Sequence, residues 1–196
     1  MGSDFSSAIR PALVMTLLFA LLVGLAYPLA ILGVGQAIFP SQANGSLVQD
    51  GEKVVGSTVI GQSFTSDRYF QTRPSAAGKG YDGLASSGSN FGPTSQALVD
   101  RVKVDVAKRR AEGLTGPLPA DLLTASGSGL DPDLSPDAAL AQVARIARIR
   151  GLAGPEIGRL VTRSVEEPTL GLLGERHINV FALNRQLDTL GANSTK

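Results

Sequence analysis

The sequence predicts a single N-terminal transmembrane helix followed by a mixed α/β extracytoplasmic domain. Three observations lead to this fold class. Residues 11–49 contain no Asp, Glu, Lys or Arg, so a long apolar stretch comes first. After it, short runs rich in Val, Ile and Thr are followed by helical periodicities. The chain also has no cysteine, so the second part must be stabilised without disulfides.

The apolar stretch is expected to cross a membrane at about residues 12–32, because roughly 20 apolar residues match the hydrocarbon thickness of a bilayer. Pro28 falls in the last turns, where a kink is tolerated if a neighbouring helix satisfies the freed carbonyl. A cleaved signal peptide is the alternative, but its apolar region would be about 7–15 residues long. The length therefore favours an uncleaved anchor, with residues 1–38 as tail and anchor.

The charge of the N-terminal tail sets the expected orientation. Asp4, Arg10 and the α-amine leave the tail slightly positive, and such a tail stays in the cytoplasm. Residues 39–196 are charge-mixed and are expected to form the extracytoplasmic domain.

The first half of this domain is predicted to hold short strands, a long loop and one helix. Residues 52–64 (EKVVGSTVIGQSF) are typical of one or two strands. Residues 67–93 show little periodicity, and a loop of this length is usually functional or disordered; its aromatic residues argue against simple disorder. A helix is expected over residues 94–113, where Leu98, Val102 and Val106 repeat every fourth position.

Residues 124–136 (TASGSGLDPDLSP) lead into the clearest helix, at residues 135–151. Ser135 suits the N-cap, Pro136 the first helical position and Gly151 the C-terminal stop. Gln142 lies among apolar positions of this helix, so it must hydrogen-bond either the preceding loop or another chain. Arg145 and Arg148 lie off the predicted apolar stripe and are assigned to a solvated face; that stripe comprises Leu140, Val143, Ala144 and Ala147.

The C-terminal region is predicted to contain a short helix at residues 154–165 and then a strand at 178–183. The strand runs into a final helix that Asn184 would cap.

The search for chemistry excludes several kinds of site. The Gly-Lys-Gly at residues 78–80 has Arg73 where a Walker A loop needs its first glycine, so it is not one. The near-neutral net charge of +1 lacks the excess of basic residues that is typical of nucleic-acid-binding proteins. The lone His177 and the absence of a Gly-x-Ser-x-Gly motif argue against a hydrolase.

A cation site is the remaining metal hypothesis. Asp131, Asp133, Ser135 and Asp137 alternate as at the start of an EF-hand loop. That loop requires Gly at its sixth position and Glu at its twelfth, whereas Pro136 and Gln142 stand there. The pattern is therefore not an EF-hand, and an irregular cation site stays open as the minority alternative.

Six ordered blocks carry a resemblance to a known family. They are QANGSL at 42–47, GSTVIGQSF at 56–64, YFQTRPSA at 69–76, SSGSNFGPT at 86–94, TASGSGLDPDLSPDAALAQVARIA at 124–147 and INVFALNRQLD at 178–188. In this order they resemble the C subunit of the Kdp potassium-transporting P-type ATPase, over nearly the whole chain. One small departure is SSGSNFGP, where the family favours SGGSNLGP.

The resemblance implies an accessory subunit of a bacterial inner-membrane complex that imports K⁺ with ATP. The implied partners are a channel-like subunit that selects the ion, a P-type pump subunit that hydrolyses ATP, and a very small subunit. The implied role is assembly, together with a catalytic chaperone effect that raises the ATP affinity of the pump subunit. No catalytic or metal-binding residue and no cofactor is assigned to this chain itself; K⁺ and ATP with Mg²⁺ belong to the complex.

The resemblance also directs attention to particular residues. Gln142 matches a glutamine of interest for the ATP effect, and the loop at residues 87–89 invites comparison with an ABC signature. The candidate partner or ligand surface consists of Arg73, Ser87, Gly88, Ser89, Asn90, Asp131 and Gln142.

The implied ATP effect conflicts with the predicted topology, because an extracytoplasmic Gln142 cannot touch cytoplasmic ATP. Either the coupling runs allosterically through the complex, or the orientation is reversed. We give the topology more weight because it rests on a physical constraint. A regulatory subunit that contacts ATP directly is the alternative function, and a membrane-anchored hydrolase is a third that the sequence disfavours.

Overall fold

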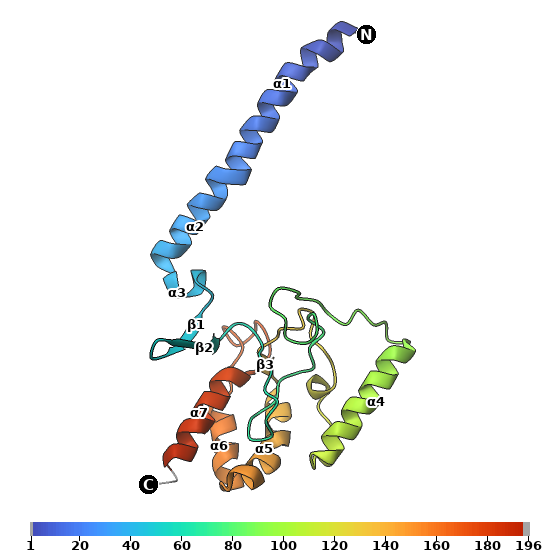
Figure 1. Cartoon of the computed structure of the whole chain (residues 1–196), viewed down its shortest axis with the longest axis vertical. Helices are drawn as coiled ribbons and strands as arrows, with labels where there is room; N and C mark the ends of the chain where they lie inside the picture. The colour runs from blue at the N-terminus through green and yellow to red at the C-terminus, as the bar shows by residue number, and fades with distance from the viewer. Residues whose placement is uncertain (1, 194–196) are drawn as a thin grey trace. The chain divides into compact units, whose positions relative to one another are not determined.

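The computed structural model describes the backbone of residues 2–193 and the side chains of residues 7–190. The chain divides into two compact units between Leu47 and Val48, and each unit is described here by itself (Figure 1).

The first unit is dominated by one long apolar helix. It consists of α1 (Gly2–Leu21), a π-helical turn η1 (Leu22–Ala26) and α2 (Tyr27–Ile38). Within residues Ser7–Ile38 the most apolar 18-residue window has a mean hydropathy of 2.4, and none of that window is buried. The predicted apolar helix is therefore confirmed, and it extends beyond residues 12–32 at both ends. By length and composition it is able to cross a membrane.

Pro28 lies directly after the π-helical turn and in the first turn of α2. A proline inside a helix cannot donate to the carbonyl four residues earlier, and its ring clashes with that carbonyl. A locally wider turn accommodates the ring without ending the helix. After α2, the short helix α3 (Pro40–Ala43) follows, and the side-chain amides of Gln36 and Asn44 hydrogen-bond each other.

The second unit contains little sheet. β1 (Leu47–Asp50) pairs with β2 (Lys53–Ser57), and β3 (Asp133–Leu134) pairs with β4 (Ile178–Asn179). The second pair is antiparallel, with Asp133 opposite Asn179 and Leu134 opposite Ile178. Of the predicted strands at residues 52–64, only β2 forms. Residues 67–93 contain no helix or strand, as the sequence predicts.

Three helices build the core of the second unit: α5 (Pro136–Arg150), α6 (Gly154–Arg163) and α7 (Val180–Asn193). α6 packs against both α5 and α7 (Figure 1). Phe70, from the long loop, is also fully buried in this core. The apolar side chains that the three helices contribute to this core cluster are Ala138, Ala139, Ile146, Ile157, Val161, Val180, Leu183 and Leu187. Removing this apolar surface from water is the main favourable term in folding.

The helix α4 (Gln96–Ala111) stands at the side of this core (Figure 1). Buried Arg109 links it to the long loop by donating from Nη1 to Gln71 Oε1 at 2.6 Å, and the same Nη1 donates to Glu112 Oε2, at the end of α4, at 3.1 Å. Gly113 follows its C-terminus with φ of +93°, which a glycine adopts without steric cost. The predicted helix is confirmed.

The terminal signals of α5 are confirmed as well. Ser135 Oγ accepts from the backbone N–H of Ala138 at 3.1 Å, Pro136 opens the helix, and Gly151 ends it in the left-handed region with φ of +67°. These contacts satisfy backbone groups that a helix end leaves without partners.

The start of α7 differs from the prediction. The strand covers only Ile178–Asn179, and the helix begins at Val180. Asn179 acts as the cap, since its Oδ1 accepts from the backbone N–H of Ala182 at 3.0 Å. The prediction of Asn184 as the cap was wrong: Asn184 lies inside the helix and is buried, because it hydrogen-bonds a distant segment.

Candidate functional site

One loop segment, residues 67–73, is held like a bound peptide by side chains from the core helices. We call it the clamped segment. The backbone N–H of Phe70 donates to Asn184 Oδ1 at 2.8 Å, and Asn184 Nδ2 donates back to the Phe70 carbonyl at 2.9 Å. The next residue repeats the pattern: the N–H of Gln71 donates to Gln142 Oε1 at 2.9 Å, and Gln142 Nε2 donates to the Gln71 carbonyl at 3.1 Å. Two side-chain amides thus satisfy the polar backbone groups of two consecutive residues, as burial requires.

Gln142 is fully buried, and its Nε2 also donates to the carbonyl of Ala138 at 3.3 Å. It therefore hydrogen-bonds a loop, but this is the clamped segment and not the loop that precedes α5. Since it has no exposed surface, Gln142 contributes to any partner or ligand surface through the residues that it positions.

Arg145 is the second clamp residue from α5. Its guanidinium donates to the carbonyl of Asp67, to the carbonyl of Tyr69 at 3.0 Å and to Gln142 Oε1 at 2.7 Å. Burial lowers the pKa of this guanidinium, and the carboxylates of Glu112 and Asp67 oppose that shift. The prediction of a solvated face was wrong for Arg145, which is only 3% exposed, because backbone carbonyls from a segment distant in sequence cover it.

The apolar stripe predicted for α5 was also partly wrong. Leu140 and Ala144 are exposed, whereas Ala138, Ala139 and Ile146 face the core.

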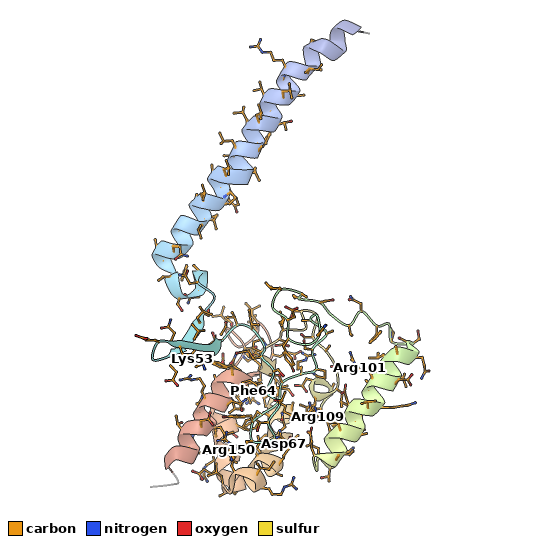
Figure 2. All side chains as sticks on the ribbon, in the orientation of Figure 1. Lys53, Phe64, Asp67, Arg101, Arg109 and Arg150 are labelled. Carbon is orange, nitrogen blue, oxygen red and sulfur yellow. The ribbon has the colours of Figure 1, made fainter. Side chains whose placement is uncertain are left out.

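Arg150 completes the clamp at the C-terminal end of α5. Its Nε donates to the carbonyl of Arg68 at 2.7 Å, and its Nη2 pairs with Asp188 at 2.8 Å. Asp67, Arg109 and Arg150 come from the loop, α4 and α5 and lie around the same region of the unit (Figure 2). Side chains from three helices therefore fix the course of the segment.

Arg73, at the end of the clamped segment, contacts Asp131. Arg73 Nη1 lies 2.9 Å from Asp131 Oδ2, and Arg73 Nε donates to the carbonyl of Thr124 at 3.4 Å. The other oxygen of Asp131 accepts from the N–H of Asp133 at 3.0 Å. Two residues singled out from separate sequence blocks thus form one ion pair.

Ser87 and Gly88 reach the same loop, residues 124–131. The N–H of Ser87 donates to the carbonyl of Ser128 at 2.9 Å. A Cβ at Gly88 would lie 3.0 Å from the carbonyl oxygen of Gly127, and one at Gly129 would lie 2.5 Å from that of Ser87. A side chain at Gly129 would force the two backbones apart, and one at Gly88 would require a smaller shift. Ser89, which is half-buried, and Asn90, which has φ of +52°, continue this segment.

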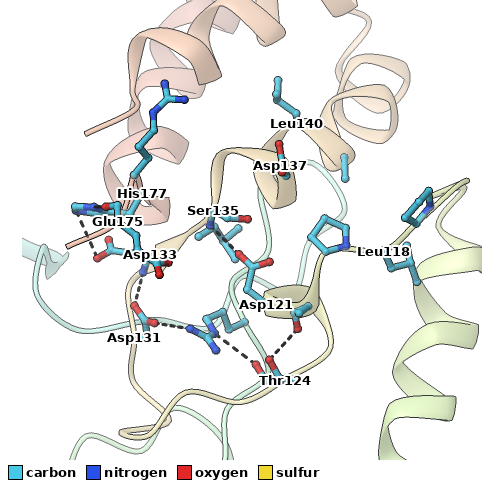
Figure 3. Close-up of a pocket in the computed structure, with 17 residues that line it drawn as sticks. Leu118, Asp121, Thr124, Asp131, Asp133, Ser135, Asp137, Leu140, Glu175 and His177 are labelled. Carbon is cyan, nitrogen blue, oxygen red and sulfur yellow. Dashed lines mark hydrogen bonds and ion pairs between the residues drawn. The ribbon is translucent and has the colours of Figure 1, made fainter. Parts of the chain in front are cut away.

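Beside this loop lies a groove of about 890 Å³ (Figure 3). We call it the acidic groove. Five carboxylates line it together with two guanidinium groups and one imidazole, so acidic groups are in excess. Apolar residues such as Leu118 and Leu140 also face it. The charged lining residues are Asp121, Asp131, Asp133, Asp137, Glu175, Arg73, Arg176 and His177. Of these, only Arg73 and Asp131 belong to the surface predicted from the sequence.

Two titratable groups at the groove perturb each other. His177 Nε2 lies 4.0 Å from Asp133 Oδ2 and 3.7 Å from Glu166 Oε2. A hydrogen bond from the ring to the carbonyl of Glu175, and then the nearby carboxylates, raise the pKa of His177. Burial raises the pKa of the Asp133 carboxyl, with His177 and Asn179 opposing this effect. Both groups therefore bind protons more tightly in the fold than in the unfolded chain.

Asp121, Glu175 and His177 were not assigned to a site from the sequence. Asp121 accepts from the N–H of Ser135 at 2.7 Å, across a separation that no local pattern reveals. Among the side chains that the structure describes, no three metal-ligating groups come together. What the groove offers is a concentration of negative charge, which attracts cations and basic surfaces.

Comparison with known proteins gives one consistent result. The family model described as "KdpC: K+-transporting ATPase, c chain" matches residues 9–189. A Potassium-transporting ATPase KdpC subunit of Caulobacter vibrioides is 54% identical over 183 residues, which cover 93% of each chain. The protein of the same name from Allorhizobium ampelinum is 52% identical over 187 residues, covering 95% of this chain and 98% of that one.

Proposed function

Since this chain belongs to the KdpC family and is thus a component of the Kdp potassium-transporting ATPase, we propose that it serves as a non-catalytic accessory subunit. In this role it assembles and stabilises the complex and raises the ATP affinity of the pump subunit indirectly. Its proposed partners are the channel-like K⁺-binding subunit, the ATP-hydrolysing pump subunit and the small single-helix subunit.

The burial of Gln142 is the observation that carries this proposal. Both polar atoms of its side chain are occupied by Gln71, Ala138 and Arg145. A residue of this kind supports a role in shaping a surface, and a nucleotide would have to break several buried hydrogen bonds to reach it. Direct ATP contact, the alternative function, therefore finds no support at Gln142.

We propose further that the chain crosses the bacterial inner membrane once, with its N-terminus in the cytoplasm and the unit from Val48 onward outside. The slightly positive N-terminal tail supports this orientation. In that position the excess of carboxylates at the acidic groove raises the local concentration of K⁺. The coupling between this chain and the ATP site of the pump then runs through the other subunits. It requires a structural element with two states whose populations are shifted both by this chain and by ATP.

The orientation is tested with single cysteines, because the natural chain has none. Ser87→Cys and Leu84→Cys place thiols at exposed loop positions, and Ser7→Cys places one at the N-terminal end of the apolar stretch, before the predicted span at residues 12–32. A membrane-impermeant maleimide applied to spheroplasts is expected to label the first two and to spare the third. Labelling of Ser7→Cys alone would reverse the orientation and reopen direct contact with cytoplasmic ATP.

The accessory role is tested by purifying the complex through a tag on this chain. The three other subunits are expected to co-purify in mild detergent, and the ATP affinity of the pump is expected to fall when this chain is omitted. The alternative is tested with Gln142→Ala, and Gln96→Ala, at an exposed position, serves as its control. ATP binding by the purified chain alone, lost in Gln142→Ala but not in the control, would favour the alternative.

A further inference from the structure

A hairpin at residues 166–177 exposes three leucines at its tip, and we call it the leucine hairpin. Leu170 is 84% exposed, Leu172 74% and Leu173 57%. Neighbouring apolar side chains this exposed are unusual on the surface of a soluble unit and mark sites of interaction. None of the three was singled out from the sequence, because the residues around them follow neither helical nor strand periodicity.

The exposure follows from an ordered backbone. Glu166 and His177 pair across the base, with N–H to carbonyl hydrogen bonds of 2.8 and 3.2 Å in opposite directions. Thr169 and Leu173 exchange two further hydrogen bonds of 3.0 Å nearer the tip. Leu170 takes φ of +57°, a conformation that is strained for a residue with a side chain. The fold therefore maintains a strained turn that points leucines outward.

The charges around the tip indicate what kind of surface covers it. Glu166, Glu167 and Glu175 are exposed on the hairpin, and Arg176 is paired with Glu167 at 3.0 Å. Glu175, Arg176 and His177 also line the acidic groove, where carboxylates outnumber the cationic groups, so the negative region continues from the hairpin into the groove. An anionic lipid surface would repel this region, because membrane-binding segments carry basic residues beside their apolar ones.

We propose that the leucine hairpin is a docking element that inserts into an apolar socket, bordered by Lys or Arg, on another protein subunit. Leucines at the tip fill the socket, and the surrounding carboxylates select the basic rim. This arrangement follows the usual anatomy of interfaces, in which an apolar centre is surrounded by polar contacts. The identity of the partner as a subunit of the same transport complex rests on the proposed function.

The first test is photo-crosslinking in the full-length chain, co-expressed with the other subunits. Benzoylphenylalanine replaces Leu172 and, in a matched control, Leu84, which is 101% exposed in another loop. A subunit adduct is expected at position 172 with about fivefold or higher yield than at position 84. Adducts with lipid, adducts only with a second copy of this chain, or equal yields at the two positions would overturn the proposal.

The second test measures retention of the partner subunits after purification through this chain. The double variant Leu170→Ser, Leu172→Ser is expected to lose about tenfold or more of the retained partner, whereas Leu84→Ser retains it. The replaced side chains are exposed, so folding is preserved and circular dichroism verifies it. If the wild-type chain retains no partner, the proposed function fails; if the double variant retains it fully, the docking proposal fails.

The basic rim is tested separately with Glu175→Lys against Glu52→Lys, a charge reversal at an exposed position outside the hairpin. A loss of retention confined to Glu175→Lys is expected, and it should grow at low salt, where charge repulsion is less screened. Equal retention in both variants would overturn the basic rim.

Discussion

Gln142 and Gln71 are joined by two hydrogen bonds, in which the side-chain amide of Gln142 takes the place that a neighbouring β-strand would occupy. The distances are 2.9 Å from the Gln71 N–H to Oε1 and 3.1 Å from Nε2 to the Gln71 carbonyl. The long loop thus gains an ordered, buried section without entering a sheet.

The first prediction concerns the loss of this amide. Gln142→Ala leaves the N–H and carbonyl of Gln71 buried without partners and removes an acceptor from Arg145. Each unsatisfied buried group costs about 1–3 kcal/mol, so we expect the free energy of unfolding to fall by about 3 kcal/mol. Urea unfolding of the detergent-solubilised chain measures it, with Gln96→Ala as the exposed control. A loss no larger than that of the control would contradict the clamp.

The second prediction is that Gln142 and Asn184 act as one unit. They hold consecutive residues, Gln71 and Phe70, so releasing either residue should loosen the segment for the other. The double variant Gln142→Ala, Asn184→Ala should therefore cost less than the two single variants added together. Sites in one hydrogen-bond network show such coupling at about 0.5–3 kcal/mol. A double-mutant cycle measures it, and strict additivity would show that the two amides are independent.

A third prediction compares two glycines of the same loop. A Cβ at Gly129 would lie 2.5 Å from the carbonyl oxygen of Ser87, and its φ is +66°. Gly129→Ala should therefore separate the two loops and destabilise the chain by about 2 kcal/mol or more. Gly127, two positions earlier, has no atom within 4 Å of its ideal Cβ, and Gly127→Ala should change stability by less than about 0.5 kcal/mol. Thermal unfolding of both variants provides the comparison, and equal shifts would refute the close approach.

The fourth prediction concerns pH. The pKa of His177 is raised above its ordinary value of 6.5 by the Glu175 carbonyl and by the carboxylates of Asp133, Glu166 and Asp131. The folded state therefore binds this proton more tightly than the unfolded state. The resulting stabilisation is fully present below about pH 6.5 and is lost as the pH rises through the folded-state pKa.

His177 is the only histidine in the chain, so an NMR titration of the imidazole yields its folded-state pKa directly. As the pH rises from about 6.5 through the folded-state pKa of His177, the stability of the wild type should fall with a slope that His177→Gln lacks. The raised pKa of Asp133 acts in the same direction at lower pH, upward from its ordinary 3.8. A measured imidazole pKa at or below 6.5 would contradict the prediction.

Local signals in the sequence were sufficient for some elements. Ser135, Pro136 and Gly151 mark the ends of α5 through contacts with their immediate neighbours, so the helix could be predicted from a short window. The apolar N-terminal helix was predictable for the same reason, since length and composition alone define it.

Other features depend on partners that are remote in sequence. Helical periodicity predicts a solvated Arg145, yet its guanidinium donates to backbone carbonyls 76 and 78 residues earlier. The strand-like pattern of Ile178 to Leu183 predicts Asn184 as the helix cap, but the side chain of Asn184 hydrogen-bonds Phe70 instead. Asn179 caps α7 instead, so the helix begins at Val180. Within the candidate surface, the ion pair between Arg73 and Asp131 could not be predicted, because only the fold brings their two sequence blocks together.

The clamp also fixes when this protein can complete its fold during synthesis. The N–H and carbonyl of Phe70 gain their hydrogen-bond partner only when Asn184, 114 residues later, has been synthesised. Until α7 has emerged, the N–H and carbonyl of Phe70 lack their Asn184 partner and stay hydrated. Messages truncated before codon 184 would consequently yield chains that keep the clamped segment open to proteases. Burial of the Phe70 peptide group with its hydrogen bonds satisfied therefore depends on completion of the C-terminal helix.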